Sequence, residues 1–551
     1  MGVLAVYDTA GIQNYIFASN KLAENVGGSR LVADIFRADG LLPEAIHKIT
    51  QQPVPDWRSG GALNRSLKAE IIYQGGGNAY VAFADDSTFQ DVTKAFLIEV
   101  NKTAPGVGIA VAAVGTDFGD TYQGDFKRLN KRLALVKGGF NIPTFAGNQP
   151  ITKQSIRTGL PVSVYRGKEK EFLTESQSKK RIRYERDNKK PNKQVQGVTD
   201  PQKIKETIED FDDLAFDKGS DSLIAIVHAD GNNMGSRIKE FMEKDEFQTY
   251  DVAVPEIRKL SVQIDNCYMA ARGKTIEAFK SAYAMYVDNF RNKYPGKYLN
   301  SEDKNYDLPP ILELIKDGDD TTLVIGGRFA IDFAVRLLRE IEKTKPDDRP
   351  FKDAAPTACA GVVLFHSHYP FSEAYKLAEE LCSSAKTPSR KYEGSYIDFH
   401  LHQSGNVSGL HHLRERQYKV DGLTIVRRPW RVSKGLEDKL PNFKWFEETA
   451  QQIKPGFEDA GNDMTNTDDK IPRNKIKAIR NAISAGEDAA KNAEYQMRGR
   501  KLPKLTLKPL DKDMSGYAPQ FDVLELLDAY ENLLNKNEVN KGGDTSDKQN
   551  Y

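Results

Sequence analysis

Residues 311–325 read Ile-Leu-Glu-Leu-Ile-Lys-Asp-Gly-Asp-Asp-Thr-Thr-Leu-Val-Ile, two apolar segments on either side of an acidic turn. Both segments have the length of a strand, and an Asp-Gly pair between two such segments predicts a tight hairpin. Most turns of this kind are plain surface turns. Whether Asp319 and Asp320 do more than reverse the chain therefore depends on the elements that flank the hairpin.

The hairpin lies in the middle of a longer series of predicted elements. A strand rich in Ile and Val runs over Ser222–Ala229 and ends at Asp230, and helical patterns follow from Met234 and over Val254–Asn289. After the hairpin the pattern predicts a helix, a strand and a helix, over Phe329–Glu342, Thr357–Phe365 and Phe371–Lys386. The order βααββαβα predicts a mixed sheet covered by helices.

The first part of the chain repeats this order. A strand over Val3–Tyr7 precedes Asp8, and a helix begins at Ile12. A second short helix is expected after Gly27-Gly28-Ser29. The remaining elements are a hairpin, a helix, a strand and a helix, over Glu70–Tyr73 with Ala79–Ala84, Thr88–Asn101, Val107–Val114 and Tyr122–Lys137. We interpret the repeat as an internal duplication of one palm-like unit.

The predicted fold class is α/β (α+β), with two ferredoxin-like palm domains, each a mixed sheet covered by helices, and a C-terminal helical domain. Helical patterns at Pro441–Ile453, Lys475–Ala490 and Asp522–Leu534 indicate that last domain. The charged stretch Arg166–Lys193 favours a solvated linker over a nucleic-acid contact. The predicted domains are a degenerate first palm (1–150), a charged linker or small insertion domain without zinc cysteines (151–220), a catalytic second palm (221–405), the helical domain (406–535) and a disordered tail (536–551).

The composition is that of an ordinary water-soluble protein with several domains. The chain has 551 residues, 39% hydrophobic and 28% charged, and its 79 Lys and Arg balance 78 Asp and Glu. Net charge therefore gives no sign of a nucleic-acid partner. Only three cysteines are present, Cys267, Cys359 and Cys382, and no two have zinc-ligand spacing. Few cysteines, no signal peptide and no membrane-length apolar run predict the cytoplasm.

Asp230, Asp319 and Asp320 are the predicted catalytic and metal-binding residues. A palm sheet places the strand that ends at Asp230 beside the hairpin, so that the three carboxylates converge. Hard cations such as Mg²⁺ or Mn²⁺ take oxygen ligands, and two metals about 4 Å apart can activate a 3′-hydroxyl and stabilise a leaving pyrophosphate. Carboxylates crowded together without a cation would repel one another.

A set of small and basic residues is predicted to bind nucleotide in the second palm. The turn after Asp230 opens a helix, and backbone N–H groups there can hold a triphosphate with help from the helix dipole. Lys386, at the end of the last predicted helix, can neutralise phosphate charge, although a lysine there can also simply offset the helix dipole. The predicted nucleotide-binding residues of this palm are Gly231, Asn232, Asn233, Gly235, Gly318 and Lys386.

The first palm lacks the acidic pair. Aligning the two hairpins puts Gly77 and Asn78 where Asp319 and Asp320 stand, and only Asp8 remains at the end of its first strand. One carboxylate rarely holds a pair of metals. This copy is therefore expected to bind a nucleotide or to be structural, with nucleotide contacts predicted from Gly27-Gly28-Ser29, Gly76 and Lys137. Two palms face to face would hold two nucleotides for joining.

Taken in order, these motifs resemble the large palm-domain subunit of type III CRISPR effector complexes, the GGDD polymerase/cyclase family that makes cyclic oligoadenylates. The resemblance spans nearly the whole chain and rests on an ordered set of segments. These are Gly11-Ile12-Gln13-Asn14-Tyr15-Ile16-Phe17, Gly27-Gly28-Ser29, Gly75-Gly76-Gly77-Asn78, Asp230-Gly231-Asn232-Asn233-Met234-Gly235, Asp317-Gly318-Asp319-Asp320, Ala385-Lys386, Ile397-Asp398-Phe399-His400 and Pro472-Arg473-Asn474-Lys475.

The resemblance implies an activity and partners. Asp319 and Asp320 would be the acidic pair of the GGDD motif, Asp230 the carboxylate of the first strand, and Ser29 a contact to a nucleotide base. The implied reaction is attack of one ATP's 3′-hydroxyl on another's α-phosphate, repeated and closed into a ring, with Mg²⁺ or Mn²⁺ as cofactor. Guide or target RNA and other subunits of a type III effector are the implied partners, in antiviral defence and without a membrane.

Three departures from the family pattern are visible. The chain begins directly at the first palm strand, so an HD nuclease domain and cleavage of single-stranded DNA are not expected. The zinc cysteines found between the palms are missing, although Thr158-Gly159-Leu160-Pro161 remains near the place of one pair. The first glycine of the GGDD motif is Asp317, which adds charge beside the predicted metal site. Such a short form could act as a stand-alone cyclase.

Two alternatives stay open. One is a cyclase that makes a cyclic dinucleotide, as GGDEF-type diguanylate cyclases do on a similar palm; the absence of a full GGDEF motif and the fused second palm speak against it. The other is a scaffold subunit of an RNA-guided complex that binds nucleotide without turnover. The acidic cluster at Asp230, Asp319 and Asp320 disfavours the scaffold, because a scaffold has no need of repelling carboxylates.

Overall fold

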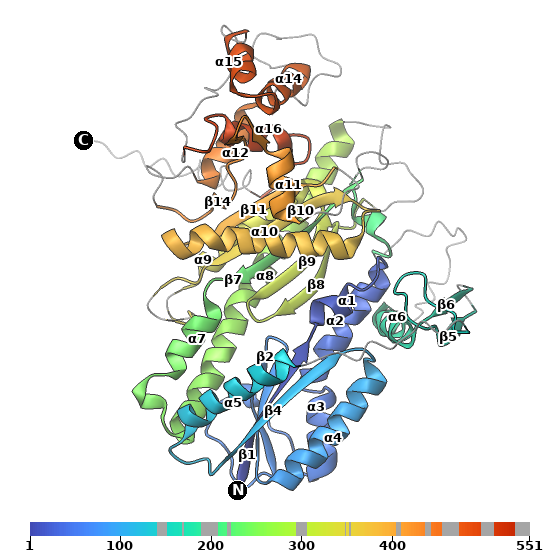
Figure 1. The fold of residues 1–551 in the computed structure, drawn as a ribbon, viewed down its shortest axis with the longest axis vertical. Coiled ribbons are helices and arrows are strands. Elements are labelled where there is room, and N and C mark those ends of the chain that lie inside the picture. The colour runs from blue at the N-terminus through green and yellow to red at the C-terminus, as the bar shows by residue number, and fades with distance from the viewer. Residues whose placement is uncertain are drawn as a thin grey trace.

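The computed structural model describes most of the chain. The described ranges are 1–139, 151–167, 170–188, 208–216, 222–293, 306–345, 347, 349–351, 354–403, 409–435, 442–453, 473–496 and 512–534. Two sheets with their helices are stacked along the long axis of the molecule, and a mainly helical part lies beyond the second sheet (Figure 1). The predicted tail at 536–551 lies outside the described residues.

The first palm is a four-stranded sheet in the order β2-β3-β1-β4. Every neighbouring pair in it is antiparallel, so this sheet is not mixed as predicted. Val3, Ala5 and Tyr7 of the central strand face one cluster of buried side chains, and Leu4 and Val6 face another, which is why both faces carry helices. The elements are β1 (Gly2–Ala10), α1 (Ile12–Ile16), α2 (Leu22–Phe36), α3 (Leu41–Thr50), β2 (Ala69–Gly75), β3 (Asn78–Phe83), α4 (Asp86–Thr103), β4 (Gly108–Thr116) and α5 (Tyr122–Gly138).

The second palm repeats the order of the first, with a six-stranded mixed sheet in the order β14-β11-β10-β7-β9-β8. Only β10 and β11 run parallel. The elements are β7 (Leu223–Gly231), α7 (Met234–Met242), α8 (Tyr250–Lys293), β8 (Ile311–Asp317), β9 (Asp320–Gly326), α9 (Ala330–Glu342), β10 (Ala358–His366), α10 (Phe371–Tyr392), β11 (Tyr396–Leu401) and β14 (Trp430–Arg431). The predicted order βααββαβα is confirmed here, and in the first palm with α3 added.

Helix α10 covers one face of the second sheet and α8 and α9 cover the other. Ile224 and Ile226 of β7 face α10, so the next even-numbered residues, His228 and Asp230, share that face. Helix α10 sits unusually close to β10 because Gly361 has no side chain: a Cβ there would lie 2.1 Å from the Ala378 carbonyl oxygen. This close packing determines the position of the C-terminal half of α10 relative to the end of β7.

The duplication extends to irregularities in the two hairpins. The β2–β3 register shifts between Ile71 and Tyr73, and the β8–β9 register shifts between Glu313 and Ile315. In both hairpins a two-residue turn follows, closed by the pairs Gly75–Asn78 and Asp317–Asp320. The register therefore confirms the predicted alignment of Gly77 and Asn78 with Asp319 and Asp320.

Each palm holds the hairpin of the other through its second helix. Arg258 of α8 is 2% exposed and donates hydrogen bonds to the carbonyl oxygens of Ile71 and Ile72 and to Glu70 in β2. Ser29 of α2 donates to the carbonyl oxygen of Leu314 in β8. These links lie at the register shift of each hairpin, where the strand pairing is interrupted. The palms thus meet head to head.

The segment between the palms is folded onto the first palm, which corrects the prediction of a solvated linker for its helical part. Helix α6 (Glu175–Asn188) packs along α2, preceded by the short hairpin β5 (Val164–Arg166) and β6 (Glu171–Leu173). Lys180 and Arg181 are 3% and 9% exposed, and Arg181 donates to the buried Glu24 at 2.9 Å. Lys180 and Arg181 of this stretch therefore serve within the fold.

Gly27 explains why α2 differs from its prediction. The expected second helix was to follow Gly27-Gly28-Ser29, but these residues lie inside α2. A Cβ on Gly27 would lie 1.8 Å from the Lys180 carbonyl oxygen, so the glycine is needed for the close crossing of α6 over α2. Packing against α6 offsets the low helix propensity of glycine.

The C-terminal part is mainly helical, and its short strand β14 joins the edge of the second sheet. The predicted single helix over 475–490 is two helices, because Gly486 adopts φ +114 between them. The helix predicted to end at Leu534 ends at Leu526, and the N–H groups of Leu533 and Leu534 instead donate to Asp332. The elements are α11 (Leu410–Gln417), β12 (Lys419–Val420), β13 (Leu423–Thr424), α12 (Phe443–Ile453), α14 (Arg473–Ser484), α15 (Glu487–Gln496) and α16 (Ala518–Leu526).

Two smaller expectations concern membranes and zinc. Within the described ranges, no helix combines the length and the hydropathy that crossing a membrane requires. The three cysteines are buried and form no disulfide, and Cys382 donates from its thiol to the carbonyl oxygen of Cys359. They behave as small core side chains.

Candidate active site

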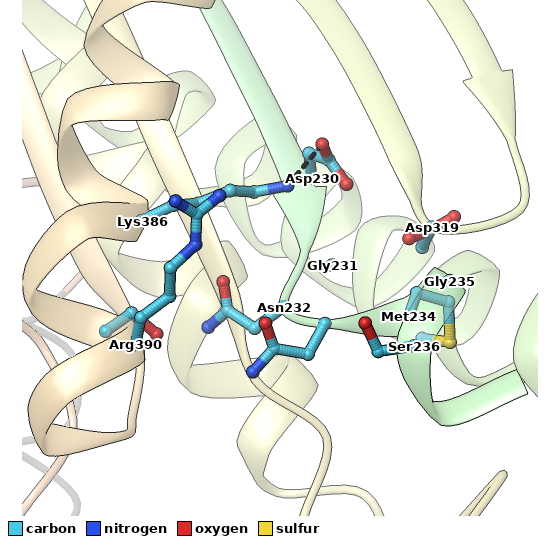
Figure 2. A pocket seen from close by; sticks show the side chains of 11 residues that line it. Asp230, Gly231, Asn232, Met234, Gly235, Ser236, Asp319, Lys386 and Arg390 are labelled. Carbon is cyan, nitrogen blue, oxygen red and sulfur yellow. Dashed lines mark hydrogen bonds and ion pairs between the residues drawn. The ribbon is translucent and has the colours of Figure 1, made fainter. Parts of the chain in front are cut away.

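A polar pocket of about 350 Å³ opens where β7 ends, between the β8–β9 turn and α10 (Figure 2). It is lined by Asp230, Gly231, Asn232, Asn233, Met234, Gly235, Ser236, Asp319, Lys386, Ser389 and Arg390. Seven of the nine residues predicted for the second palm's site are among them. Gly318 and Asp320 lie in the adjoining hairpin and do not line the pocket.

Lys386 reaches the pocket from α10 and donates a hydrogen bond to Oδ2 of Asp230. The prediction that Lys386 ends its helix is wrong: α10 continues through Pro388 to Tyr392. Lys386 is therefore not a residue that offsets the helix dipole at a C-terminus. Burial alone would lower the pKa of Lys386, but the Asp230 carboxylate outweighs it and raises that pKa above its ordinary value. The ammonium group stays charged at neutral pH.

Asp319 occupies the turn of the β8–β9 hairpin and packs against Gly231. A Cβ at position 231 would lie 2.7 Å from Oδ2 of Asp319 and 2.8 Å from the hydroxyl of Tyr268. Glycine at this position is thus required by the carboxylate beside it. Burial, followed by the negative charge of Asp230, raises the pKa of Asp319 to about 6. Tyr268, in the middle of α8, was not predicted, because no local motif marks it.

Asp320 lies on the face of the sheet that α10 covers. Its Oδ1 is 3.4 Å from Nδ1 of His228, which is 3.0 Å from the hydroxyl of Thr322. Burial lowers the pKa of His228 to about 4, so the imidazole is neutral at neutral pH and does not compensate the carboxylate. Burial, then the charges of Asp230 and Asp319, raises the pKa of Asp320 well above its ordinary value.

These carboxylates fit a cation that shares its ligands with a bound molecule. Oδ1 of Asp320 is shielded from solvent and accepts no hydrogen bond, and the crowding that raises the pKa of Asp319 and Asp320 is what a cation relieves. In the described ranges, however, no three His, Cys, Asp or Glu side chains are spaced to hold a metal by themselves. Mg²⁺ commonly takes one or two carboxylates and completes its shell with phosphate oxygens and water.

The turn after Asp230 places the N-terminus of α7 at the pocket. Asn233 adopts φ +55 and precedes the first residue of the helix. The backbone N–H of Asn232 donates to the carbonyl oxygen of Thr357 at 2.9 Å, and its side-chain N–H₂ donates to the hydroxyl of Thr357 and to the carbonyl oxygen of Gly394. Asn232 therefore anchors the turn. Its side-chain Oδ1 is shielded from solvent and accepts no hydrogen bond.

Arg390 and Ser389 line the pocket and were missed by the sequence analysis. Arg390 lies one helical turn after Lys386, and both side chains extend from α10 toward the pocket (Figure 2). The spacing i, i+4 is the signal that could have found Arg390, but it was lost because Pro388 suggested that the helix had ended. Two cations from α10 thus line the same pocket as Asp230 and Asp319.

The first palm contains a matching pair of charges. Nζ of Lys137 in α5 is 2.8 Å from Oδ1 of Asp8 in β1, as Lys386 in α10 is bonded to Asp230 in β7. The duplication thus preserves an Asp–Lys pair in both palms. Of the predicted first-palm residues, Ser29 bonds Leu314, and Gly76 is exposed in its turn at φ +62. Neither Ser29, Gly76 nor Lys137 lines the pocket of the second palm.

Comparison with known proteins gives one family match and a consistent set of solved structures. Residues 223–393 match the family model of the Cas10/Cmr2 second palm domain. No curated protein matched the sequence. Solved structures with a similar fold include a Csm1–Csm4 cassette in complex with AMPPNP (15% identity, TM-score 0.51) and one in complex with cA4 (12% identity, TM-score 0.51).

The Csm1 structure from T. onnurineus is similar to the same degree, with 15% identity and a TM-score of 0.51. Each of these three alignments covers 96% of this chain and 69% of the solved chain. At such identities the similarity establishes the fold, which therefore extends over both palms and the helical part.

Proposed function

Because residues 223–393 belong to the Cas10/Cmr2 second palm domain family, we propose that this protein is a nucleotidyltransferase that joins ATP molecules into cyclic oligonucleotides. The 3′-oxygen of one ATP attacks the α-phosphorus of another, the bond from that phosphorus to the β-phosphate bridge oxygen breaks, and pyrophosphate leaves with its electrons. The hydroxyl proton is released. Repetition followed by an intramolecular step gives a ring, with cyclic oligoadenylate as the expected product.

The observation that carries the proposal is the opposed charge of the second palm's pocket. Asp230 and Asp319 line it together with Lys386 and Arg390, and Lys386 bonds Asp230 directly. A triphosphate needs basic side chains around it, and a metal ion that bridges it to the protein needs carboxylates. The pocket supplies both kinds of side chain at the N-terminus of α7. An apolar or singly charged pocket would not fit a nucleoside triphosphate.

Each residue has a role that follows from its position. Lys386 exchanges its bond with Asp230 for a phosphate oxygen when the nucleotide enters, which frees the carboxylate. Arg390 can take two phosphate oxygens with its fork of N–H donors. Mg²⁺ or Mn²⁺, held by Asp230, Asp319 and Asp320 together with phosphate oxygens, would neutralise charge that develops on the reacting oxygens.

The first palm is expected to hold the second nucleotide. It lacks the acidic pair and retains the Asp8–Lys137 pair at 2.8 Å, a cation within reach of phosphate but without a cluster of carboxylates. Gly76, Ser29 and Lys137 are its proposed contacts. The head-to-head arrangement of the palms would then bring two nucleotides together, one from each half of the duplication.

The proposed setting is antiviral defence in the cytoplasm. Structures with this fold include Csm1–Csm4 cassettes in complex with AMPPNP and with cA4. By analogy, guide or target RNA and other subunits of a type III effector are proposed partners of this chain. A nucleotide-binding scaffold without turnover is the second candidate, and it is favoured by the hydrogen bond from Lys386 to Asp230, which occupies a carboxylate that a catalytic metal would need.

The experiment is mass spectrometry of the products after the full chain is incubated with each nucleoside triphosphate and Mg²⁺ or Mn²⁺. A cyclic oligoadenylate from ATP supports the proposal, whereas a cyclic dinucleotide identifies the other class of cyclase. If no product forms with or without target RNA and partner subunits, while calorimetry shows nucleotide binding, the scaffold replaces the enzyme.

A further inference from the structure

Asp317 makes the direct contact between the turns of the two hairpins. Its Oδ2 accepts a hydrogen bond of 2.8 Å from the backbone N–H of Gly77, which lies 240 residues away in the sequence. Gly77 is in the turn of the first palm's hairpin, and Asp317 begins the turn of the catalytic hairpin. We call this hydrogen bond the inter-palm tie. The expectation that Asp317 adds charge beside the predicted metal site did not include this contact.

The Gly77 end of the tie is held rigidly. The carbonyl oxygen of Gly77 accepts a hydrogen bond of 2.9 Å from the backbone N–H of Thr9 and another from the Thr9 hydroxyl. Gly77 adopts φ +76, and a Cβ there would lie 2.7 Å from Cδ1 of Ile12. Thr9 thus holds the carbonyl side of Gly77, and at the observed φ the Gly77 N–H donates to Asp317.

The Asp317 end is connected directly to the predicted catalytic residues. Asp317 pairs with Asp320 at the base of the turn, and only Gly318 and Asp319 lie between them. β8 is an edge strand that pairs with β9 alone, so its end needs support from elsewhere. Any movement of Asp317 relative to the first palm would move Asp319 and Asp320 as well.

We propose that Asp317 is a positioning residue whose carboxylate fixes the catalytic turn against the first palm, so that a nucleotide chain held between the palms stays aligned for ring closure. A glycine in this position has no side chain and cannot make the bond. An asparagine can, because its amide oxygen accepts a hydrogen bond as the carboxylate does. The consequence for ring closure rests on the proposed function; the tie itself does not.

The tie is tested by hydrogen exchange of the Gly77 amide in the full chain without nucleotide. Asp317→Ala and Asp317→Gly are expected to speed this exchange about tenfold, the effect of losing one charge-assisted hydrogen bond at a partly exposed site. Asp317→Asn should stay within about twofold of the unmodified protein. Lys316→Ala, an exposed neighbour on the same strand, is the matched control and should change nothing. Equal exchange in all variants would overturn the proposal.

The positioning role is tested by the ratio of linear to cyclic product from ATP. Asp317→Ala should raise this ratio several-fold, because linear intermediates leave before the ring closes, and Asp317→Asn should restore it. A substitution that merely unfolds part of the sample lowers all products equally and leaves the ratio unchanged. An unchanged ratio with faster Gly77 exchange would refute the positioning role.

Failure of this inference and failure of the proposed function give different results. If the unmodified protein makes no product, the proposed function is refuted, and the role of Asp317 in ring closure is refuted with it. Hydrogen exchange of the Gly77 amide then still shows whether the inter-palm tie exists. If the protein makes cyclic product and the Asp317 variants match it in both assays, only the inference falls.

Discussion

Gly231→Ala gives a sharp test of the site because it adds one methyl group and no charge. The new Cβ would lie 2.7 Å from Oδ2 of Asp319, 2.8 Å from the Tyr268 hydroxyl and 2.9 Å from Cβ of Asp319. Ordinary contact begins at 3.4 Å, so the carboxylate must retreat by about 0.7 Å. Tyr268, the other group that the new Cβ would meet, is 2% exposed and has little room to move.

A displacement of about 1 Å at a reacting centre costs about 10²-fold in rate, so we expect product formation to fall about 10- to 100-fold. Overpacking should also lower the free energy of unfolding by about 1–3 kcal/mol, and rates are therefore compared per folded molecule. Gly273→Ala is the matched control: Gly273 is exposed in α8, and an added Cβ there would meet open space. That variant should be more stable by about 0.5–1 kcal/mol with an unchanged rate.

The assay is single-turnover product formation from ATP, with urea unfolding of both variants in parallel. A Gly231→Ala protein that is folded and forms product within twofold of the unmodified rate would refute the reasoning, because Asp319 would then not need its position. Loss of activity in the Gly273→Ala control would equally remove the steric explanation.

Three further predictions concern the charges of the two palms. Arg390→Ala should weaken ATP-analogue binding about tenfold in calorimetry with stability within about 0.5 kcal/mol, since Arg390 is exposed; unchanged affinity would exclude it from the triphosphate site. Burial and Asp230 raise the pKa of Asp319 from 3.8 to about 6, so folding binds a proton between these values and stability falls as pH rises through them. Asp319→Asn should remove that loss and be about 1–3 kcal/mol more stable at pH 7 in a chelator, and parallel pH curves from urea unfolding would contradict this. Lys137→Ala should lower ATP affinity several-fold and spare metal affinity, whereas equal ATP affinity would remove the first palm from nucleotide binding.

The sequence predicted the fold well where patterns were local and strong. The apolar strands on either side of the acidic turn, the strand before Asp230 and the repeated order of elements all lie close to their predicted bounds. What the sequence could not show were contacts between distant segments. Gly27 lies within α2 because α6 crosses the helix at that residue. The prediction that a helix begins after Gly27-Gly28-Ser29 was wrong for that reason.

The candidate site shows the same division. The second-palm residues around Asp230 and Lys386 were predicted from local motifs, and they do line one pocket. Arg390 was missed because a proline inside a helix was taken for its end, and Tyr268 because nothing near it in sequence marks it. The tie from Asp317 to Gly77 depends on the packing of two domains, and no pattern within either hairpin indicates it.

The most direct test of the central claim compares the products of the unmodified protein with those of the Asp319→Ala, Asp320→Ala double variant. Both are incubated with ATP and Mg²⁺ and analysed by mass spectrometry, and urea unfolding verifies that the variant is folded. We expect cyclic oligoadenylate from the unmodified protein and none from the variant. Synthesis that persists in the folded double variant would contradict the assignment of the active site to the second palm's acidic turn.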